Sequence, residues 1–354
     1  MTKAALTPSG RFPRASGNGS GKARPRRRWR ACGRVLEVGA GLALLAIFGC
    51  SWFPAGGGGG GGSAPAIGGS PAPTGSQLAA IPVGPDPRGL ALDPSGRVWV
   101  AVHDAGTVVE IAGGEASRSI AVPDPDALAF DASGDLWVGT DSGIRGFSAS
   151  GVPLGSVADP AVEGIAVASG SVYASLPSIG AVRAYAINGT TLGSGVTLIS
   201  GGGTPHDLLV DRAGRLWVAD GEANRVARYD QPDQSSVAPE LRWCGFDAEG
   251  LAMDASGSVY ALGNSTIAEV SASPSVSIAQ DSRMAGAVRM AADDQGRFWV
   301  AARTINQVAL VQATGSVSTL ATSVFTPFDV LRDASGSVWV SSEGSGQVDE
   351  FSGT

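Results

Sequence analysis

The sequence has only two histidines, and one of them, His206, stands at a similar spacing in line with three acidic residues. Asp126, Glu163, His206 and Glu249 follow one another at intervals of 37, 43 and 43 residues. A histidine nitrogen combined with carboxylate oxygens suits Zn, Mn, Mg or Ca, depending on the geometry and on bound waters. These four residues therefore suggest a divalent-cation site, provided that the fold brings one residue from each interval to the same place.

A sequence repeat predicts a fold that would bring these four residues together. From about residue 77, seven units follow one another, each with a short apolar strand, a turn that contains a glycine, and a second strand with an aromatic residue three positions after the glycine. The turn glycines are Gly96, Gly134, Gly170, Gly214, Gly257, Gly296 and Gly336, and the aromatics are Trp99, Trp137, Tyr173, Trp217, Tyr260, Trp299 and Trp339. The glycines are 36 to 44 residues apart, which is the length of a four-stranded propeller blade.

The turn residues have a structural explanation. Six units carry an Asp three positions before the glycine, and the third unit lacks it and is one residue shorter. The six are Asp93, Asp131, Asp211, Asp254, Asp293 and Asp333. Asp in such a turn bonds its own backbone while Gly takes a positive φ, so turn formation rather than metal binding is expected for all six. The aromatics, present in every unit, are expected to pack between units.

The two ends of the repeat region complete each other. The last unit ends after its third strand, and the segment "QLAAIPVG" (77–84) before the first unit is a spare strand. Pairing the two would close a ring and leave few exposed edges. The sequence thus predicts an all-β, seven-bladed β-propeller of four-stranded blades over residues 77–354, with the N-terminal strand closing the last blade.

Counting from each turn glycine gives the residues expected at one face of such a ring. Where the chain enters the inner strands stand Arg88, Asp126, Glu163, His206, Glu249, Val288 and Phe328; in the loops after the second strands stand His103, Asp141, Pro177, Gly221, Asn264, Arg303 and Glu343. Asp126, Glu163, His206 and Glu249 come from consecutive units, so we expect them to converge as metal ligands. Arg88 could clamp an anionic group opposite them, and His103 and Arg303 are further ligand-binding candidates. The alternative is that solvated loops simply collect charge.

The fourth unit, "DLLVDRAGRLWVADGEANRVARYD" (207–230), resembles the NHL repeat in its Val-Asp, Gly-x-Leu-Trp-Val-Ala-Asp and Asn-Arg-Val elements. At this level residues 77–354 are similar to bacterial NHL-type propellers, to the virginiamycin B lyase family and to gluconolactonase-like propellers. The lyase resemblance implies a histidine and a glutamate acting with a divalent metal, for which His206 and Glu249 are the catalytic candidates, with His103 three blades away. The lactonase resemblance implies a carboxylate-rich metal site from Asp126, Glu163 and Glu249.

The N-terminus is typical of an export signal. Residues 1–34 carry ten Lys or Arg and no acid, and an apolar stretch ends at Gly49 and Cys50, as in a secretory signal. Ile47-Phe48-Gly49-Cys50 resembles a bacterial lipobox, which implies that residues 1–49 are a lipoprotein signal peptide and that Cys50 is lipidated. A disulfide from Cys50 to Cys244 is the alternative. Residues 50–76, rich in Gly, Ser, Pro and Ala, are expected to be a tether.

Charge narrows the class of partner. From Cys50 onward the chain has 15 Arg, no Lys and 31 Asp or Glu, so its surface repels phosphate backbones and attracts cations. Nucleic acid is therefore not an expected partner. We expect a monomeric lipoprotein at the bacterial cell envelope, on its periplasmic or extracellular face, that touches the membrane through its lipid anchor only. It would act as a binding or scaffold module for an envelope protein, a glycan or a small polar ligand. A metal-dependent lyase or lactonase using the same face, with Mg, Ca, Mn or Zn as its cation, is the alternative.

Replacing Cys50 with Ala tests the anchor. We expect the variant to escape processing before residue 50 and to leave the membrane fraction, because the acyl chains would have no sulfur to attach to. Cell fractionation and the mass of the mature N-terminus measure both effects, with Cys244→Ala as the control. Unchanged processing and unchanged membrane association would contradict the anchor.

Overall fold

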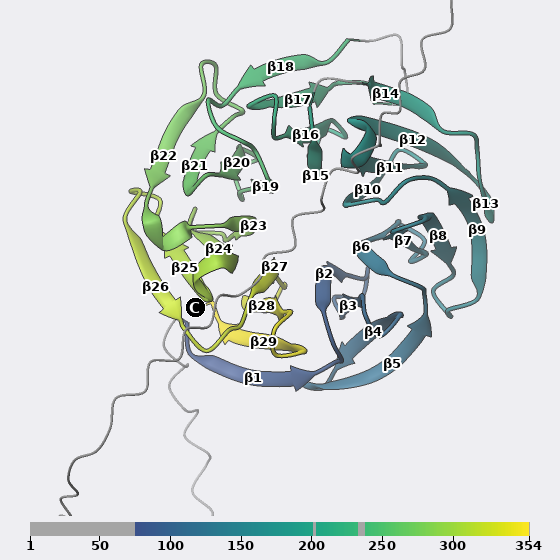
Figure 1. Cartoon of the computed structure of the whole chain (residues 1–354), viewed down its shortest axis with the longest axis horizontal. Coiled ribbons are helices and arrows are strands. Elements are labelled where there is room, and N and C mark those ends of the chain that lie inside the picture. The colour runs from purple at the N-terminus through teal and green to yellow at the C-terminus, as the bar shows by residue number, and fades with distance from the viewer. Residues whose placement is uncertain (1–74, 201–202, 233–237, 354) are drawn as a thin grey trace, which may run out of the picture. The chain divides into compact units, whose positions relative to one another are not determined.

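The computed structural model describes residues 75–200, 203–232 and 238–353. Seven small antiparallel sheets are arranged around a central channel, with β2, β6, β10, β15, β19, β23 and β27 innermost (Figure 1). Within the described residues there is no α-helix, and no helix is long and apolar enough to cross a membrane. The predicted signal peptide, Cys50 and nearly all of the predicted tether lie outside the described residues.

The first four blades are built from consecutive strands that follow one another from the channel outward. Blade 1 has β2 (Pro87–Leu92), β3 (Val98–Val102), β4 (Thr107–Ala112) and β5 (Glu115–Ala121); blade 2 has β6 (Pro125–Phe130), β7 (Leu136–Thr140), β8 (Gly143–Phe147) and β9 (Pro153–Ala158). Blade 3 has β10 (Gly164–Ala168), β11 (Ser171–Leu176), β12 (Ala181–Asn188) and β14 (Val196–Ser200), with the two-residue β13 (Thr191–Leu192) on the end of β12. Blade 4 has β15 (Pro205–Val210), β16 (Leu216–Asp220), β17 (Arg225–Tyr229) and β18 (Glu240–Trp243).

The remaining blades keep this order until the last strand of the ring. Blade 5 has β19 (Gly250–Met253), β20 (Val259–Gly263), β21 (Thr266–Glu269) and β22 (Val276–Gln280); blade 6 has β23 (Ala287–Ala292), β24 (Phe298–Ala302), β25 (Gln307–Val311) and β26 (Val317–Ala321). Blade 7 has β27 (Pro327–Arg332), β28 (Ser337–Ser342), β29 (Gln347–Ser352) and β1 (Gln77–Pro82). Three short 3-10 turns complete the described elements: η1 (Pro177–Ile179), η2 (Ser282–Met284) and η3 (Arg303–Ile305).

The ring is closed as the sequence predicts. β1 runs antiparallel to β29, with Ile81 opposite Val348 and Pro82 opposite Gln347. Ile81 is 3% exposed, and it packs with apolar residues of blade 1 and with Trp339 of blade 7. Because the first described strand supplies the outer strand of the last blade, the two ends of the domain hold each other in place.

The six turn aspartates act as predicted, and five of them do more. In each turn one carboxylate oxygen accepts the backbone N–H groups two and four residues later. In all but the Asp293 turn, the other oxygen accepts the ring N–H or O–H of the aromatic residue six positions on. For example, Trp217 donates its indole N–H to Asp211 at 2.8 Å. The turn therefore orients the aromatic side chain as well as the backbone.

The aromatic residues fill the spaces between blades. Trp217 of blade 4, which is fully buried, packs with Leu251 and Val259 of blade 5, and Trp99 of blade 1 packs with Leu128 and Leu136 of blade 2. Apolar contact between successive sheets thus sets the angular spacing of the ring.

Close contacts between inner strands fix the channel. The Ser175 hydroxyl of blade 3 donates to the backbone carbonyl of His206 in blade 4 at 2.7 Å. A Cβ on Gly164 would lie 2.3 Å from that same carbonyl oxygen, so only glycine lets the two strands approach this closely. The backbone of His206 is therefore fixed by its contacts with Gly164 and Ser175, independently of the contacts that its side chain makes.

Replacing Asp211 with Ala should lower the free energy of unfolding by about 3 kcal/mol, because the buried indole N–H of Trp217 and two turn N–H groups would lose their acceptor. Urea unfolding followed by tryptophan fluorescence measures this. Asp294→Ala is the matched control, since that carboxylate is 73% exposed, and it should change stability by no more than about 0.5 kcal/mol. Equal effects of the two substitutions would contradict the role given to the turn.

Candidate binding site at the channel mouth

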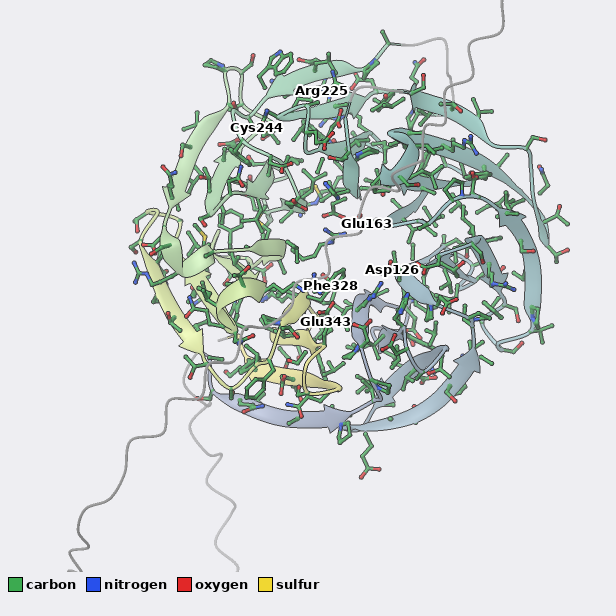
Figure 2. All side chains as sticks on the ribbon, viewed as in Figure 1. Asp126, Glu163, Arg225, Cys244, Phe328 and Glu343 are labelled. Atoms are coloured by element: carbon green, nitrogen blue, oxygen red, sulfur yellow. The ribbon has the colours of Figure 1, made fainter. Side chains whose placement is uncertain are left out.

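The seven residues that enter the inner strands lie around one opening of the channel. Figure 2 shows Asp126, Glu163 and Phe328 gathered around it, although they come from blades 2, 3 and 7. Each inner strand begins directly before or directly after this position. The side chains are therefore carried on short, paired strands rather than on long loops, which limits their movement.

Glu163, His206 and Glu249 form a close group at the mouth. Nδ1 of His206 lies 2.7 Å from Oε1 of Glu163, and Nε2 lies 3.8 Å from Oε2 of Glu249. One donor atom from each residue lies within 4.8 Å of the other two. The His206 side chain is 17% exposed and the two glutamates are 34% and 28% exposed, so all three remain reachable from solvent.

The two glutamates face different nitrogens of the imidazole. An ionised Glu163 can only accept, so Nδ1 of His206 carries the proton that joins them. In the neutral ring Nε2 then presents its lone pair on the side of Glu249. The 3.8 Å gap to Glu249 is too long for a hydrogen bond, and it can be spanned by two ligand bonds of about 2.1 Å each. This side of the ring is therefore suited to hold either a proton or a cation.

The pKa directions agree with this arrangement. Burial by itself would lower the pKa of His206, but the hydrogen bond from its ring to Glu163 and the charges of Glu163 and Glu249 outweigh it, and the pKa is raised. Burial would raise the pKa of Glu163, yet the hydrogen bond and charge of His206 lower it. The pKa of Glu249 is raised, chiefly by burial and also by the charge of Asp247. Glu163 is thus the hydrogen-bonded partner of His206. Glu249 lies too far from Nε2 for a hydrogen bond, and the charges of His206 and Arg289 lower its pKa by less than burial and Asp247 raise it.

Asp247 is a further acidic residue at the mouth that counting along the repeat missed. Its Oδ1 is buried and has no hydrogen-bond partner among the described residues. A Cβ on Gly221 would lie 2.1 Å from this oxygen and 3.1 Å from Nε2 of His206, so Asp247 and His206 both press against Gly221. Asp247 stands in the loop before β19, outside the two positions that the count compared, and sequence spacing gave no signal for it. Asp247 is outside the group of donor atoms within 4.8 Å of one another, so its unpartnered oxygen adds negative charge on the Nε2 side rather than a further ligand.

Asp126 does not join this group. Its Oδ1 accepts from Nη1 of Arg88 at 3.1 Å, and Arg88 also binds Asp86 at 2.8 Å. Burial raises the pKa of Asp126 more than Arg88 lowers it. Arg88 is therefore held in place by two carboxylates at the mouth, next to the metal-type group rather than within it.

The second histidine is also placed elsewhere. Nδ1 of His103 lies 3.3 Å from Asp104 and 3.6 Å from Asp86, and Nε2 lies 3.7 Å from Asp141. His103, Asp86 and Asp104 form a separate group with donor atoms within 4.8 Å of one another, although Arg88 already occupies Asp86. The two histidines thus belong to two different clusters.

Arg303 pairs with Glu343 of the neighbouring blade through Oε2. The Arg303 guanidinium also lies 5.5 Å from the centre of the Phe328 ring, within the range of a cation–π contact. Of the ligand-binding candidates, Arg88 and Arg303 therefore lie close to the mouth residues Asp126 and Phe328, and His103 lies beside Arg88's partner Asp86.

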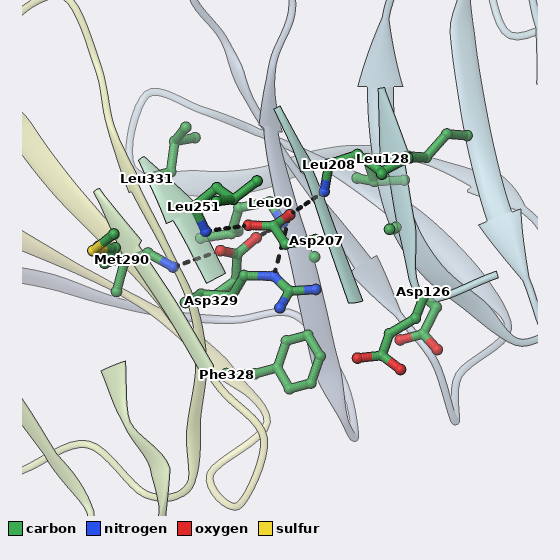
Figure 3. A pocket seen from close by; sticks show the side chains of 17 residues that line it. Leu90, Asp126, Leu128, Asp207, Leu208, Leu251, Met290, Phe328, Asp329 and Leu331 are labelled. Atoms are coloured by element: carbon green, nitrogen blue, oxygen red, sulfur yellow. Dashed lines mark hydrogen bonds and ion pairs between the residues drawn. The ribbon is translucent and has the colours of Figure 1, made fainter. Parts of the chain in front are cut away.

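A cavity of about 300 Å³ lies in the channel and is lined by the inner strands of all seven blades (Figure 3). Two aspartates in it tie neighbouring blades together: Asp207 accepts the N–H of Leu251 at 2.8 Å, and Asp329 accepts the N–H of Leu90 at 2.8 Å. Burial raises the pKa of Asp329 to about 6. These carboxylates also escaped the sequence count, because they stand one position after the residues that it compared.

The positive charge of Arg289 offsets part of the negative charge of the carboxylates in the channel. Its side chain is 11% exposed, its guanidinium lies 3.8 Å from Asp207, and Nη1 donates to the carbonyl of Glu249 at 3.0 Å. Its charge lowers the pKa of Glu163, Glu249 and Asp329. Arg289 thus fixes the backbone of Glu249 and helps to keep the mouth carboxylates ionised.

No protein-family model and no curated protein matches this chain in sequence. Solved structures match over most of the chain. A streptogramin B lyase aligns with a TM-score of 0.67 at 14% identity, covering 77% of this chain and 96% of its own. A catalytically inactive histidine-to-alanine variant of virginiamycin B lyase from Staphylococcus aureus, with quinupristin, aligns with a TM-score of 0.68 at 13% identity, covering 77% and 98%.

The chain shares the seven-bladed propeller fold of these lyase structures. The fold is also shared by U3-55K, with a TM-score of 0.62, 12% identity and coverage of 76% and 94%. At identities of 12 to 14%, these structural likenesses show the architecture of the chain and not its activity. The side chains at the mouth must decide what this chain does.

The ionisation of His206 is directly measurable. Its folded pKa should lie above 6.5, so the stabilising charge pair with Glu163 is fully present below the unfolded value and is lost as the pH rises through the folded pKa. Two-dimensional NMR of the imidazole gives the pKa, and Glu163→Gln should lower it. Urea unfolding as a function of pH should show the stability gap between the native protein and His206→Ala narrowing as the pH rises. A gap that widens would contradict the assignment.

Proposed function

We propose that this chain is a binding module that takes up a small polar ligand, together with a divalent cation, at the channel mouth. The observation that supports this proposal is the imidazole of His206, held by Glu163 through one nitrogen and facing Glu249 across 3.8 Å with the other. The cluster opens beside a cavity of about 300 Å³, at the lower end of the usual size of ligand pockets.

His206 Nε2 and Glu249 would hold the cation, with the unpartnered oxygen of Asp247 on the same side. Glu163 would then be the positioning residue, because a carboxylate on the remote nitrogen fixes the orientation of a metal-binding histidine and raises its basicity. One nitrogen with several carboxylate oxygens suits Mn²⁺ or Zn²⁺ better than Mg²⁺ or Ca²⁺, which prefer oxygen alone. The cation would supply a positive charge that polarises a bound oxygen.

A metal-dependent lyase is the second candidate, and one observation favours it. The fold is that of virginiamycin B lyase, for which a histidine-to-alanine variant is catalytically inactive, and the Glu163–His206 pair has the geometry of an oriented base. Against it, the other histidine of this chain lies in the separate cluster with Asp86 and Asp104. A lactonase would need more carboxylates than Glu163 and Glu249, and Asp126 is held by Arg88.

The location belongs to the same proposal. The lipobox-like ending at Cys50, the tether and the acidic composition support a monomer anchored at the bacterial cell envelope by lipid. In that setting the ligand would come from the medium around the envelope.

Replacing His206 with Ala should weaken Mn²⁺ binding by about 100-fold or more, and Glu163→Gln by about tenfold, since supporting residues typically contribute roughly 10- to 100-fold. Isothermal titration calorimetry, run at a pH above the His206 pKa that NMR gives, measures both. Asp294→Ala, which changes an exposed carboxylate outside both clusters of donor atoms, is the control and should leave Mn²⁺ affinity unchanged.

Two outcomes would change this conclusion. A native chain that binds neither Mn²⁺ nor Zn²⁺, or a His206→Ala variant that binds as well as the native chain, would overturn the cation site. Turnover of quinupristin by the native chain, abolished by His206→Ala, would replace the binding module with the lyase.

A further inference from the structure

The mouth has two chemically different halves. The residues that blades 1 to 5 contribute at the ring of entering positions are all ionisable: Arg88, Asp126, Glu163, His206 and Glu249. Blades 6 and 7 contribute Val288 and Phe328 at the same positions. An apolar sector therefore interrupts the charged ring beside the proposed cation site, and the sequence repeat does not require a phenylalanine there.

Phe328 borders the cavity and is not fully buried in the core. It is partly buried, and it lines the 300 Å³ space together with the ends of the inner strands, as Figure 3 shows. Five other apolar residues border the same space, but they are only 5 to 8% exposed and pack in the core between blades: Leu90, Leu128, Leu208, Leu251 and Met290. An engineered cavity of roughly 150 Å³ is enough to admit benzene, so a single six-membered ring fits beside Phe328 with room for a substituent.

The proposed cation selects the sign of that substituent. The guanidinium groups of Arg289 and Arg303 lie 5.9 and 5.5 Å from the centre of the Phe328 ring, but Arg289 is paired with Asp207 and Arg303 with Glu343. An apolar group lying against Phe328 would therefore meet largely neutralised charge. A positively charged substituent would be repelled by the proposed cation at His206, and a carboxylate-like substituent would be attracted to it.

We infer that the ligand of this site is an amphipathic anion, with an aromatic-sized apolar group beside Phe328 and a carboxylate-like oxygen group on the cation held by His206 and Glu249. The inference rests on the proposed function and specifies the chemical class of the ligand. Phe328 is then a specificity residue: it contacts the apolar part of the ligand and leaves the cation untouched.

The test compares three small probes on the Mn²⁺-loaded full chain by calorimetry. Benzoate has both parts of the proposed ligand, acetate has only the anionic part, and benzylammonium has the ring with the opposite charge. Benzoate should bind about tenfold more tightly than acetate, the order expected for one aromatic contact in a desolvated pocket, and benzylammonium should not compete with it.

Phe328→Ala should remove the preference for benzoate and leave the affinities for acetate and Mn²⁺ unchanged. Phe325→Ala is the matched control, because that side chain is 54% exposed and does not line the cavity, and it should keep the preference. Phe328→Leu preserves apolar volume and should restore part of it, which separates loss of contact from loss of folding.

The results distinguish the two proposals. If Mn²⁺ fails to bind, the proposed cation site is wrong and the ligand class falls with it. If Mn²⁺ binds while benzoate and acetate bind equally, or neither binds, or benzylammonium binds better, the cation site stands and the amphipathic anion is wrong. Loss of the benzoate preference in Phe325→Ala to the same degree as in Phe328→Ala would also overturn the role of Phe328.

Discussion

Closure of the ring by β1 and β29 is the constraint on which the rest of this structure depends. A single blade is a four-stranded sheet whose two faces are apolar, and it buries them only against neighbouring blades. The end blades would each leave one face in water unless the last met the first. Pairing the first described strand with the last, around Ile81 and Val348, makes blade 7 from both ends of the domain. Once the ring is closed, the seven inner strands must converge on one channel.

The convergence creates an electrostatic problem that the mouth residues resolve in pairs. Inner strands with acidic residues at their entry bring carboxylates within a few ångströms of one another in a partly dry channel, where like charges repel strongly. Arg88 forms an ion pair with Asp126 and Arg289 with Asp207, and the His206 imidazole is hydrogen-bonded to Glu163. Glu249 lies 3.8 Å from Nε2 of the same imidazole without a hydrogen bond to it, and Asp247 on that side has one buried oxygen with no hydrogen-bond partner among the described residues. The remaining negative charge on that side is the physical basis for placing a cation there.

The fold alone does not decide between binding and catalysis. The same fold is found in virginiamycin B lyases and in U3-55K, and in this chain blade packing depends on turn aspartates and buried aromatics that lie away from the channel mouth. In this chain the entering positions hold one histidine, three acidic residues, a phenylalanine, a valine and an arginine that is already paired.

The sequence by itself determined the architecture and the face on which the site lies. The spacing of Gly214 and its equivalents set the number of blades, and the spare strand before the first unit set how the ring closes, because both follow from local turn chemistry and strand periodicity. The same count placed His206 among acidic residues at one opening of the channel. Only the tertiary structure decided which of these side chains touch: Asp126 turned toward Arg88 rather than toward His206, and Asp247 entered from a loop position with no counterpart in the count. Such contacts depend on which neighbour across the blades offers the nearest opposite charge or the nearest empty volume, and spacing along the chain encodes neither.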